Sequence, residues 1–444
     1  MILKTLRLLS GRGAGWKLGS DLLGRVLQYA LLWGAARTLP QADFGDFTFA
    51  LSIGFMLAQV ADFGLQLYVQ RELARLSISG ATQRPYFMDE AAAGKLIGGG
   101  LAIKALLSVA AMLLIGAVVL LEPVGNKAAL VLVGFSMVLG TALEYMSYCF
   151  RAVGNLRLEA AANLISRAVN LALGAALLLF GVGVWGLALA SSVAMVAGLA
   201  YSYRLLLRYV RPIWRPDWAY WRRSMGQPTA VGIGIIFSII SFRVDNLLIV
   251  PMVGREALAV YNVAYKLFEP TLIVPGVVLA GLFPLLSQAG ATALKKGKLR
   301  DVLGQTMCAL ALLGAGAALV LLVVAVPLVG FLYGAEYAAS AGVLQLLAFA
   351  CLPMYINYGL THALIAVDRP KLYALFTLVS LFVNVAANVS LIPLLGVAGA
   401  AVATIATEVV LLVLCGGSIM AYLAKIPQQR ALDPAIERTL EGLP

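Results

Sequence analysis

Ionisable side chains lie deep within long apolar segments of this sequence, and their position determines what chemistry they could perform. A charge at the centre of a bilayer costs about 2.5–3.5 kcal/mol on insertion scales, so such residues usually mark a substrate or ion pathway. The basic members of the set are Arg25, Lys104, Arg167, Arg243 and Lys266, and the acidic members are Asp21, Asp62, Glu144, Asp245, Glu269 and Glu408.

The spacing of these charges predicts which of them interact. Asp21 and Arg25 are four residues apart, and Lys266 and Glu269 are three apart, so each pair shares one face of a helix. Such pairs either form part of a site or simply hold helices together, and the sequence leaves both readings open. Arg243 and Asp245 are two residues apart and should point to different faces of their helix.

The elements that must position these residues are membrane-spanning helices. Of 444 residues, 61% are hydrophobic and only 12% are charged, and the mean hydropathy is +0.92. A soluble domain carries about 25% charged residues, and about 20 apolar residues cross a bilayer core. We predict an all-α polytopic membrane protein of about 12 transmembrane helices. The expected spans are 16–38, 46–69, 92–121, 127–150, 158–180, 184–204, 226–250, 257–286, 303–331, 341–366, 371–393 and 397–423.

The basic residues give these spans an orientation. Of the 33 Lys and Arg residues, 25 fall on the side of the N-terminus and 3 on the other side, and the remaining 5 are the basic residues within spans. The positive-inside rule therefore places both termini in the cytoplasm. The net charge of +12 does not indicate nucleic acid binding, because the basic residues lie at the ends of apolar blocks.

The two halves of the chain repeat each other at an offset of about 214 residues. Phe-Thr-Phe-Ala at 47–50 matches Tyr-Asn-Val-Ala at 261–264, and Asn170 matches Asn384. A repeat of six spans keeps its orientation, so we expect two six-helix bundles related by a pseudo-twofold axis along the membrane normal. The predicted units are bundles at 1–208 and 226–424, an interfacial amphipathic linker at 209–225 and a cytoplasmic tail at 425–444.

The charges within the spans do not follow this repeat. The position equivalent to Arg25 is Ile239, and those equivalent to Lys104 and Arg167 are Ala318 and Leu381. The helical scaffold repeats in both halves but the charged residues within it do not, which favours an asymmetric site that binds one substrate.

The predicted linker has its own pattern. Trp214, Trp218 and Trp221 follow helical spacing, with Arg residues between them. This spacing suits a helix lying in the membrane interface, and the alternative is a basic loop anchored by tryptophans.

Several kinds of site are excluded by composition. The four cysteines lie in apolar blocks without a C-x-x-C pair, and His362 is the only histidine, so we expect no metal, no cofactor and no catalytic residues. Gly181-x-Gly183-x-x-Gly186 falls in a short turn between spans, without the strand that a dinucleotide-binding fingerprint requires. The outer loops are too short to carry the polar chemistry of a membrane-embedded glycosyltransferase, so we expect that the protein is not an enzyme.

Seven short segments have a characteristic order and spacing. They are Ala42–Ala50, Ala61–Leu65, Arg71–Ala74, Phe150–Asn155, Asp245–Leu248, Ala259–Tyr265 and Phe283–Ser287. In this order the segments resemble the polysaccharide-transport (Wzx-type) flippases of the MOP (MATE-like) superfamily. The resemblance covers nearly the whole chain, and it implies a bacterial inner-membrane protein.

The resemblance implies a flippase that moves undecaprenyl-diphosphate-linked oligosaccharides across the membrane by alternating access. Its expected partners are that substrate and membrane lipids, together with a polysaccharide polymerase and chain-length proteins. Arg offers bidentate geometry to phosphate oxygens, so Arg25, Arg243, Lys266, Lys104 and Arg167 are the candidate headgroup ligands. Asp21, Glu269 and Asp245 are the candidate ion-coupling residues.

Two alternatives remain at this stage. A MATE-like multidrug exporter would share the composition and the fold, but it would need acidic groups facing its cavity to bind organic cations. A membrane scaffold in an envelope-assembly complex would leave the buried charges unexplained.

Overall fold

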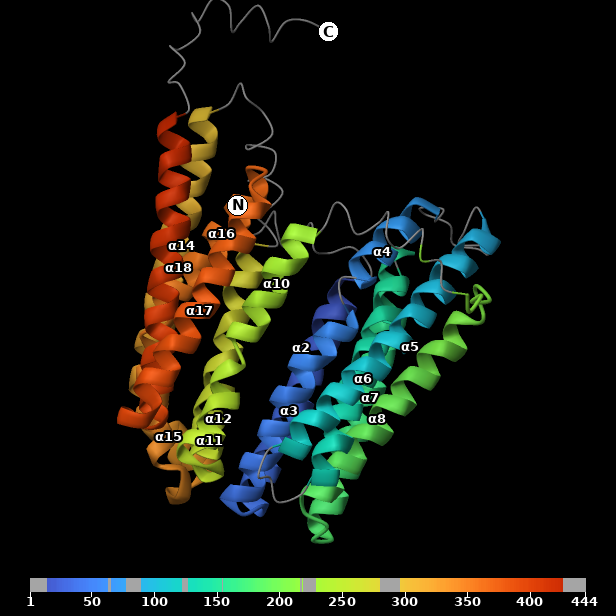
Figure 1. Ribbon diagram of the computed structural model, residues 1–444, viewed down its shortest axis with the longest axis horizontal. Helices are drawn as coiled ribbons and strands as arrows, with labels where there is room; N and C mark the ends of the chain where they lie inside the picture. The colour runs from blue at the N-terminus through green and yellow to red at the C-terminus, as the bar shows by residue number, and fades with distance from the viewer. Residues whose placement is uncertain are drawn as a thin grey trace, which may run out of the picture.

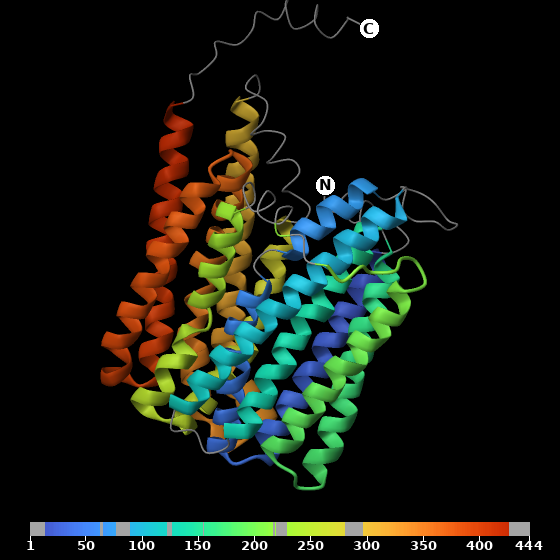
Figure 2. The same ribbon diagram turned by 45° about the vertical axis from the view of Figure 1, so that its right-hand side comes forward.

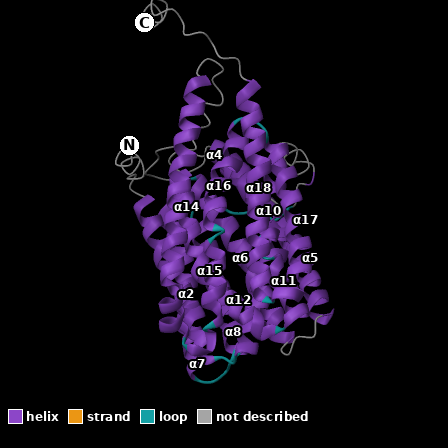
Figure 3. Cartoon of the chain, turned by 90° about the vertical axis from the view of Figure 1, so that its left-hand side faces the viewer, coloured by secondary structure: helices purple, strands orange, loops and turns teal. Residues whose placement is uncertain are grey.

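The computed structural model describes residues 14–62, 65–76, 89–121, 127–153, 155–215, 218, 229–279 and 296–425. Within these residues the regular structure is helical and contains no strand (Figure 3). The fold is therefore all-α, as predicted.

The helices form two groups that lie side by side (Figures 1 and 2). The first contains α2 (Ala14–Thr38), α3 (Gln41–Asp62), α4 (Leu65–Leu76), α5 (Glu90–Leu121), α6 (Lys127–Ala152), α7 (Leu156–Leu179) and α8 (Val184–Leu206). The second contains α10 (Thr229–Ser241), α11 (Val244–Val253), α12 (Arg255–Phe268), η1 (Glu269–Leu272), α14 (Lys296–Tyr333), η2 (Ala335–Tyr337), α15 (Ala339–Ala348), α16 (Cys351–Ala366), α17 (Pro370–Leu395) and α18 (Val397–Lys425).

Most of these helices are long and apolar enough to cross a bilayer. Eight spans qualify within the described residues, one of them formed by α10 and α11 together, and the pair α15 and α16, bent by 44°, makes a ninth if it is one span. The helices α2, α3 and α12 fall short in length or apolar composition, and they carry several of the charges expected within spans. With these three helices, the described residues are consistent with the twelve predicted spans.

Helix boundaries confirm the internal repeat. Helix α3 begins at Gln41 and α12 at Arg255, and α7 begins at Leu156 and α17 at Pro370, so both pairs keep the 214-residue offset. The bent pair α15 and α16 ends at Ala366, which is equivalent to the end of α6 at Ala152.

The span expected at 46–69 covers most of α3, which is described to Asp62, and the start of α4, which is described from Leu65; residues 63–64 lie outside the described residues. Two further predicted spans differ from the structure. The span expected at 226–250 breaks between α10 and α11, at residues 242–243. The span expected at 257–286 changes from α-helix to a 3₁₀ turn at Glu269, where Pro270 removes a backbone donor, and helical backbone resumes over 273–279.

Part of the predicted linker can be compared with the structure. Residues 211–215 are described and are not helical, and the backbone N–H of Ile213 donates to the carbonyl of Gly94 on α5 at 2.9 Å. Most of the rest of the expected interfacial helix, and nearly all of the tail from 425 onward, lie outside the described residues.

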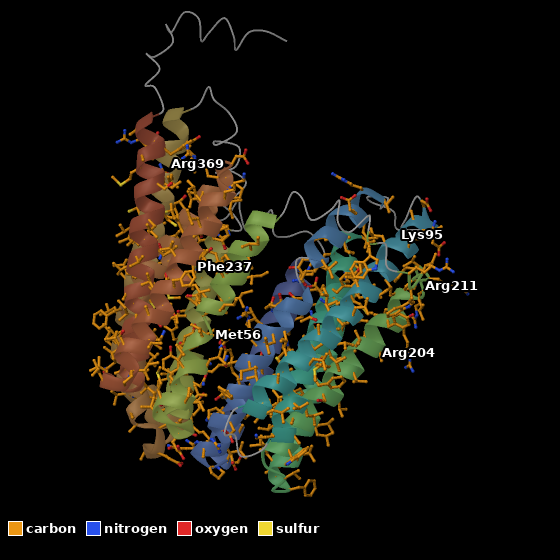
Figure 4. The ribbon with its side chains drawn as sticks, viewed as in Figure 1. Met56, Lys95, Arg204, Arg211, Phe237 and Arg369 are labelled. Atoms are coloured by element: carbon orange, nitrogen blue, oxygen red, sulfur yellow. The ribbon has the colours of Figure 1, made fainter. Side chains whose placement is uncertain are left out.

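The two bundles meet at the end of the molecule where α2 ends and α3 begins, and their ribbons diverge toward the end where α18 terminates (Figure 1). We call these the closed end and the basic end; Lys95, Arg204 and Arg369 lie toward the latter (Figure 4). One apolar core cluster crosses the contact and includes Phe44, Phe49, Tyr261 and Tyr337. This packing determines how α3 faces α11 and α12, and so it positions the charged residues near the interruptions of those two helices.

Candidate functional site

Two interrupted helices bring the central charges together. Arg243 is the N-terminal cap residue of α11 and the second residue of the break that separates α11 from α10. Glu269 is the first residue of η1, directly after α12 ends. Interrupted membrane helices occur where the backbone lines a cavity, because elsewhere the freed polar groups would meet hydrocarbon. The breaks therefore favour this region as the site.

Arg243 connects the two bundles. Its Nη2 donates to Oε1 of Glu269 at 3.1 Å, and its guanidinium carbon lies 5.6 Å from the ring centroids of both Tyr265 and Phe55. Phe55 belongs to α3 of the first bundle, whereas Tyr265 belongs to α12. The side chain of Arg243 is 15% exposed, so the cation is mostly enclosed without being sealed from a ligand.

Glu269 is shared between two cations. Its Oε2 accepts a hydrogen bond from Nζ of Lys266 at 2.7 Å, while Oε1 serves Arg243. The side chain of Lys266 is 14% exposed and that of Glu269 is 28% exposed. The predicted pair of Lys266 and Glu269 is thus confirmed, and the structure adds Arg243 as a third member.

Helix α2 adds another cation to this group. Glu269 interacts electrostatically with Arg25, and Tyr29 interacts with Arg25, Arg243 and Glu269. Arg25 is exposed on α2, one helical turn before Tyr29. The group Arg25, Arg243, Lys266 and Glu269, which we call the central cation cluster, therefore holds three positive charges and one negative charge.

Arg167 lies beside the central cation cluster, on α7. It interacts electrostatically with Asp21 and Arg25, and its guanidinium packs against the backbone of α2 at Gly24. A Cβ added at Gly24 would lie 2.6 Å from Cδ of Arg167, so glycine is what lets the side chain cross there. Its buried Nη1 makes no hydrogen bond among the described residues, which leaves a donor for a ligand.

Asp245 interacts electrostatically with Arg243, but its hydrogen bonds are made outside the central cation cluster. It is buried, and it accepts hydrogen bonds from the hydroxyl of Tyr261 and from the backbone N–H of Asn246. These partners place Asp245 in the packing of α11 against α12.

Lys104 lies apart from the other predicted site residues. It is buried on α5, with its ammonium group 5.9 Å from the ring centroid of Tyr145 on α6. It lines a groove between α5, α6 and α8, on the side of the first bundle away from the second (Figure 1).

A buried polar network holds the closed end together. Asn262 donates to the Thr48 hydroxyl at 3.1 Å, Asn246 donates to the Ser52 hydroxyl at 2.5 Å, and Arg255 pairs with Asp46 at 3.1 Å. Each bond joins α3 to α11 or α12. A Cβ at Gly45 would lie 2.1 Å from the Arg255 carbonyl, so glycine is needed for this close approach.

The central cation cluster lies on the basic side of this network. Along α3, Phe55 is 14 residues from Gln41, or about 21 Å at 1.5 Å per residue, which is well within hydrocarbon depth. Figure 4 places Met56 of α3 and Phe237 of α10 on the facing sides of the two bundles, toward the diverging end. The arrangement is a net cationic site, closed from one end of the molecule, which suits an anionic group.

Sequence reasoning missed the residues that carry no charge. Phe55, Tyr29 and Tyr265 surround the cations, and Thr48 and Asn262 close one end, yet none is unusual in an apolar segment. Thr48 and Asn262 did carry a signal, since they are equivalent positions of the repeat.

Comparison with protein families identifies two matching regions. Residues 10–290 match the family described as "Polysaccharide biosynthesis protein", and residues 230–390 match the family described as "MatE". A curated relative, the "Probable low-salt glycan biosynthesis flippase Agl15" of Haloferax volcanii, is 28% identical over 144 residues. The match covers 32% of this chain and spans 30% of that protein's length.

Solved structures share the fold at low identity. An inward-facing multidrug resistance MATE family transporter of the MOP superfamily is 14% identical, with a TM-score of 0.74 over 92% of this chain and 96% of its own. The lipid II flippase MurJ, in an inward closed conformation, is 12% identical, with a TM-score of 0.70 over 92% of this chain and 89% of its own.

A third solved structure concerns a binding pocket. A MOP superfamily transporter from Pyrococcus furiosus, whose description reports reverse polarity of its binding pocket, is 14% identical with a TM-score of 0.61. The match covers 93% of this chain and 94% of the Pyrococcus furiosus transporter. The first family match spans more than half of the chain, and the fold agrees with it: the chain belongs to the polysaccharide biosynthesis protein family, with the fold of the MOP superfamily.

Proposed function

We propose that the chain is a flippase that moves an undecaprenyl-diphosphate-linked oligosaccharide between the leaflets of the bacterial inner membrane. The observation that carries this proposal is the central cation cluster, with a net positive charge, between two bundles at membrane depth. A diphosphate needs cationic partners there, because an unpaired anion would be strongly disfavoured in a low dielectric. The family membership and the name of the Haloferax relative support the same substrate class.

In this proposal Arg243 and Lys266 are the primary diphosphate ligands, and Arg25 and Arg167 assist from α2 and α7. Glu269 neutralises Arg243 and Lys266 while the site is empty, and the diphosphate takes its place when the substrate enters. The oligosaccharide occupies the space between the bundles, and the polyprenyl chain stays in the bilayer.

Transport requires the site to open alternately at its two ends. The polar network at Thr48, Ser52, Asn246 and Asn262 closes one end, while the ribbons diverge at the other. Its hydrogen bonds and the pair of Arg255 with Asp46 must separate when the bundles rock. Moderate polar bonds suit this role, since each contributes only about 1 kcal/mol net and can be exchanged for water.

We place the basic end and both termini in the cytoplasm, following the positive-inside rule. The substrate then enters from the cytoplasmic side, at the end where the bundles diverge. A polysaccharide polymerase and chain-length proteins would receive the product on the outer side.

Ion coupling is assigned to Asp21 and Glu269, which lie among the cations. Asp245 is less suited to this role, because it is buried against Tyr261 and Asn246 in the packing of α11 against α12. Normal transport by Asp21→Asn and Glu269→Gln under varied proton and sodium gradients would refute the assignment.

A multidrug exporter is the competing function, because residues 230–390 match the MatE family and solved MATE transporters share the fold. The charge of the site separates the two functions. Organic cations would be repelled by the three cations near Glu269, whereas a diphosphate would be attracted.

The deciding experiment measures ligand binding and flipping with the purified full chain in proteoliposomes. A fluorescent short oligosaccharide linked to polyprenyl diphosphate should be translocated, and Arg243→Ala and Lys266→Ala should each lose most of that activity. Arg300→Ala, which removes an exposed cation on α14, is the matched control and should retain it. Saturable binding of an organic cation without any binding of the diphosphate would favour the exporter instead.

A further inference from the structure

A second site candidate lies outside the central cation cluster, on the lateral face of the first bundle. A groove of about 840 Å³ runs between α5, α6 and α8. Its lining is apolar over most of its length, from Leu101 to Leu113 along α5, or about 18 Å of helix. Val109, Leu113 and Val196 in this lining are 60%, 71% and 50% exposed, so the groove is open to the bilayer.

The basic end of this groove carries polar and charged groups that an ordinary lipid-facing surface lacks. Lys104 lines it and is 1% exposed. Trp214 and Tyr203 line it as well, and the Trp214 indole donates to the Tyr203 hydroxyl at 3.4 Å. Tryptophan and tyrosine prefer the depth of lipid headgroups, so this end of the groove lies near the membrane surface.

Lys104 contributes a positive charge to the wall of the groove. Its side chain is 1% exposed, and its ammonium group lies 5.9 Å from the ring centroid of Tyr145 on α6. Helical side chains lean toward the N-terminus of their helix, which for α5 is the basic end, so this charge lies on the headgroup side of its backbone. The equivalent residue of the second half is Ala318, so this cation is not part of the repeated frame.

Further cations surround the mouth of the groove. Residues 211–215 cross α5 in close contact with Gly94 and Gly98, where an added Cβ would lie 2.5 Å or less from the carbonyls of Arg211 and Ile213. This crossing fixes Arg211 and Arg215 beside α5. Figure 4 shows Lys95 of α5, Arg204 of α8 and Arg211 at this same end. All four side chains are exposed.

We propose that this groove is a binding site for an anionic phospholipid of the leaflet at the basic end. One acyl chain lies in the groove between α5 and α8. The phosphate lies at Trp214, with Lys104 beneath it and Arg211, Arg215, Lys95 and Arg204 around it. Basic pockets between membrane helices on the cytoplasmic side commonly select anionic headgroups. The site is separate from the proposed transport pathway and does not depend on which substrate is transported.

The test uses phosphatidylglycerol and phosphatidylcholine with brominated acyl chains, which quench tryptophan fluorescence on contact. The full chain is reconstituted in phosphatidylcholine vesicles containing a minor fraction of either brominated lipid. Subtracting the signal of Trp214→Phe isolates the quenching at Trp214. Brominated phosphatidylglycerol should be enriched at Trp214 over brominated phosphatidylcholine by at least about fivefold, the effect of one basic residue at the membrane surface.

Two independent variants test the charges. Lys104→Gln and the double variant Arg211→Gln/Arg215→Gln should each reduce the preference for phosphatidylglycerol severalfold. The double variant changes only exposed side chains, so it remains informative if the buried substitution impairs folding. Lys371→Gln, which removes an exposed cation from α17 of the second bundle, is the control and should leave the preference unchanged.

Two results would overturn the proposal. Equal quenching by the two brominated lipids in the unmodified chain would mean that the groove holds bulk lipid only. A preference that survives in the double variant would mean that the cations at the mouth do not select the headgroup.

Discussion

Replacing Glu269 by glutamine should strengthen the binding of a diphosphate rather than weaken it. The carboxylate accepts one hydrogen bond from Arg243 at 3.1 Å and another from Lys266 at 2.7 Å. It therefore occupies the same donors that a phosphate would use. Glutamine has a similar shape, keeps one acceptor oxygen and removes the negative charge.

The size of the effect follows from Coulomb's law. A carboxylate and a phosphate about 5 Å apart repel by about 3 kcal/mol at an effective dielectric constant of 20. The Glu269 side chain is 28% exposed, so solvent screens part of this repulsion. We expect a gain of about 1.5–3 kcal/mol, which corresponds to roughly 10- to 150-fold tighter binding.

The assay is a titration of the purified full chain in lipid nanodiscs with polyprenyl diphosphate, followed by a flipping assay on the same preparation. Tighter binding should accompany slower flipping, because the headgroup no longer has a competitor that displaces it from Arg243 and Lys266. Glu72→Gln is the matched control, since Glu72 pairs with Arg75 on α4 at 3.0 Å, outside the central cation cluster. Unchanged or weaker diphosphate binding by Glu269→Gln would refute the idea that the carboxylate and the substrate compete.

Three further predictions concern the central cation cluster, the closed end and the fold. Arg243→Ala should weaken diphosphate binding about 10- to 100-fold in the same titration, the loss of about one charge-assisted hydrogen bond. The thermal stability should change little, because Lys266 still neutralises Glu269. Asp46→Cys/Arg255→Cys should form a disulfide under oxidation and stop flipping until it is reduced, and full flipping by the cross-linked protein would contradict a gate at this end. Glu159→Gln should lower the free energy of unfolding by about 3 kcal/mol, which should appear as a lower midpoint temperature of thermal unfolding. Glu159 is fully buried, and its Oε1 lies 2.5 Å from Nη2 of Arg151, whose charge it neutralises.

Hydropathy predicted the long apolar helices because it depends on composition over about 20 residues, which a single charge hardly alters. It did not predict where the backbone breaks. Pro270 signalled the change to a 3₁₀ turn after Glu269, but no glycine or proline marks the break at Phe242 and Arg243. That break is stabilised by tertiary contacts, namely those of Arg243 with Phe55, Tyr265 and Glu269.

Membrane depth alone was a limited guide to which charges meet. It selected Arg25, Arg243, Lys266 and Glu269, which the structure brings together. It also selected Lys104, which lies at similar depth but on the opposite face of its bundle. The face on which a charge lies depends on how the bundle packs, and a helix that is apolar on all sides gives little indication of this.

The repeat explains how the site arose at this position. Residues close to a pseudo-twofold axis meet their own equivalents, as Thr48 and Asn262 do at an offset of 214 residues. The same offset relates Phe55 to Glu269 and Tyr29 to Arg243. Arg243 therefore lies against both members of one equivalent pair, an aromatic ring from the first half and a carboxylate from the second.

Two copies of one element have thus diverged in chemistry while keeping their place beside the axis. The first half supplies the aromatic rings of Tyr29 and Phe55, and the second supplies the ions of Arg243 and Glu269. Rocking one bundle against the other must change the distance from Arg243 to Phe55 but can leave its distance to Glu269 unchanged, because Arg243 and Glu269 belong to the same bundle. In the proposed transport cycle, the three ions that belong to the second bundle, Arg243, Lys266 and Glu269, would keep a bound headgroup while the aromatic wall and Arg25 of the first bundle move past it.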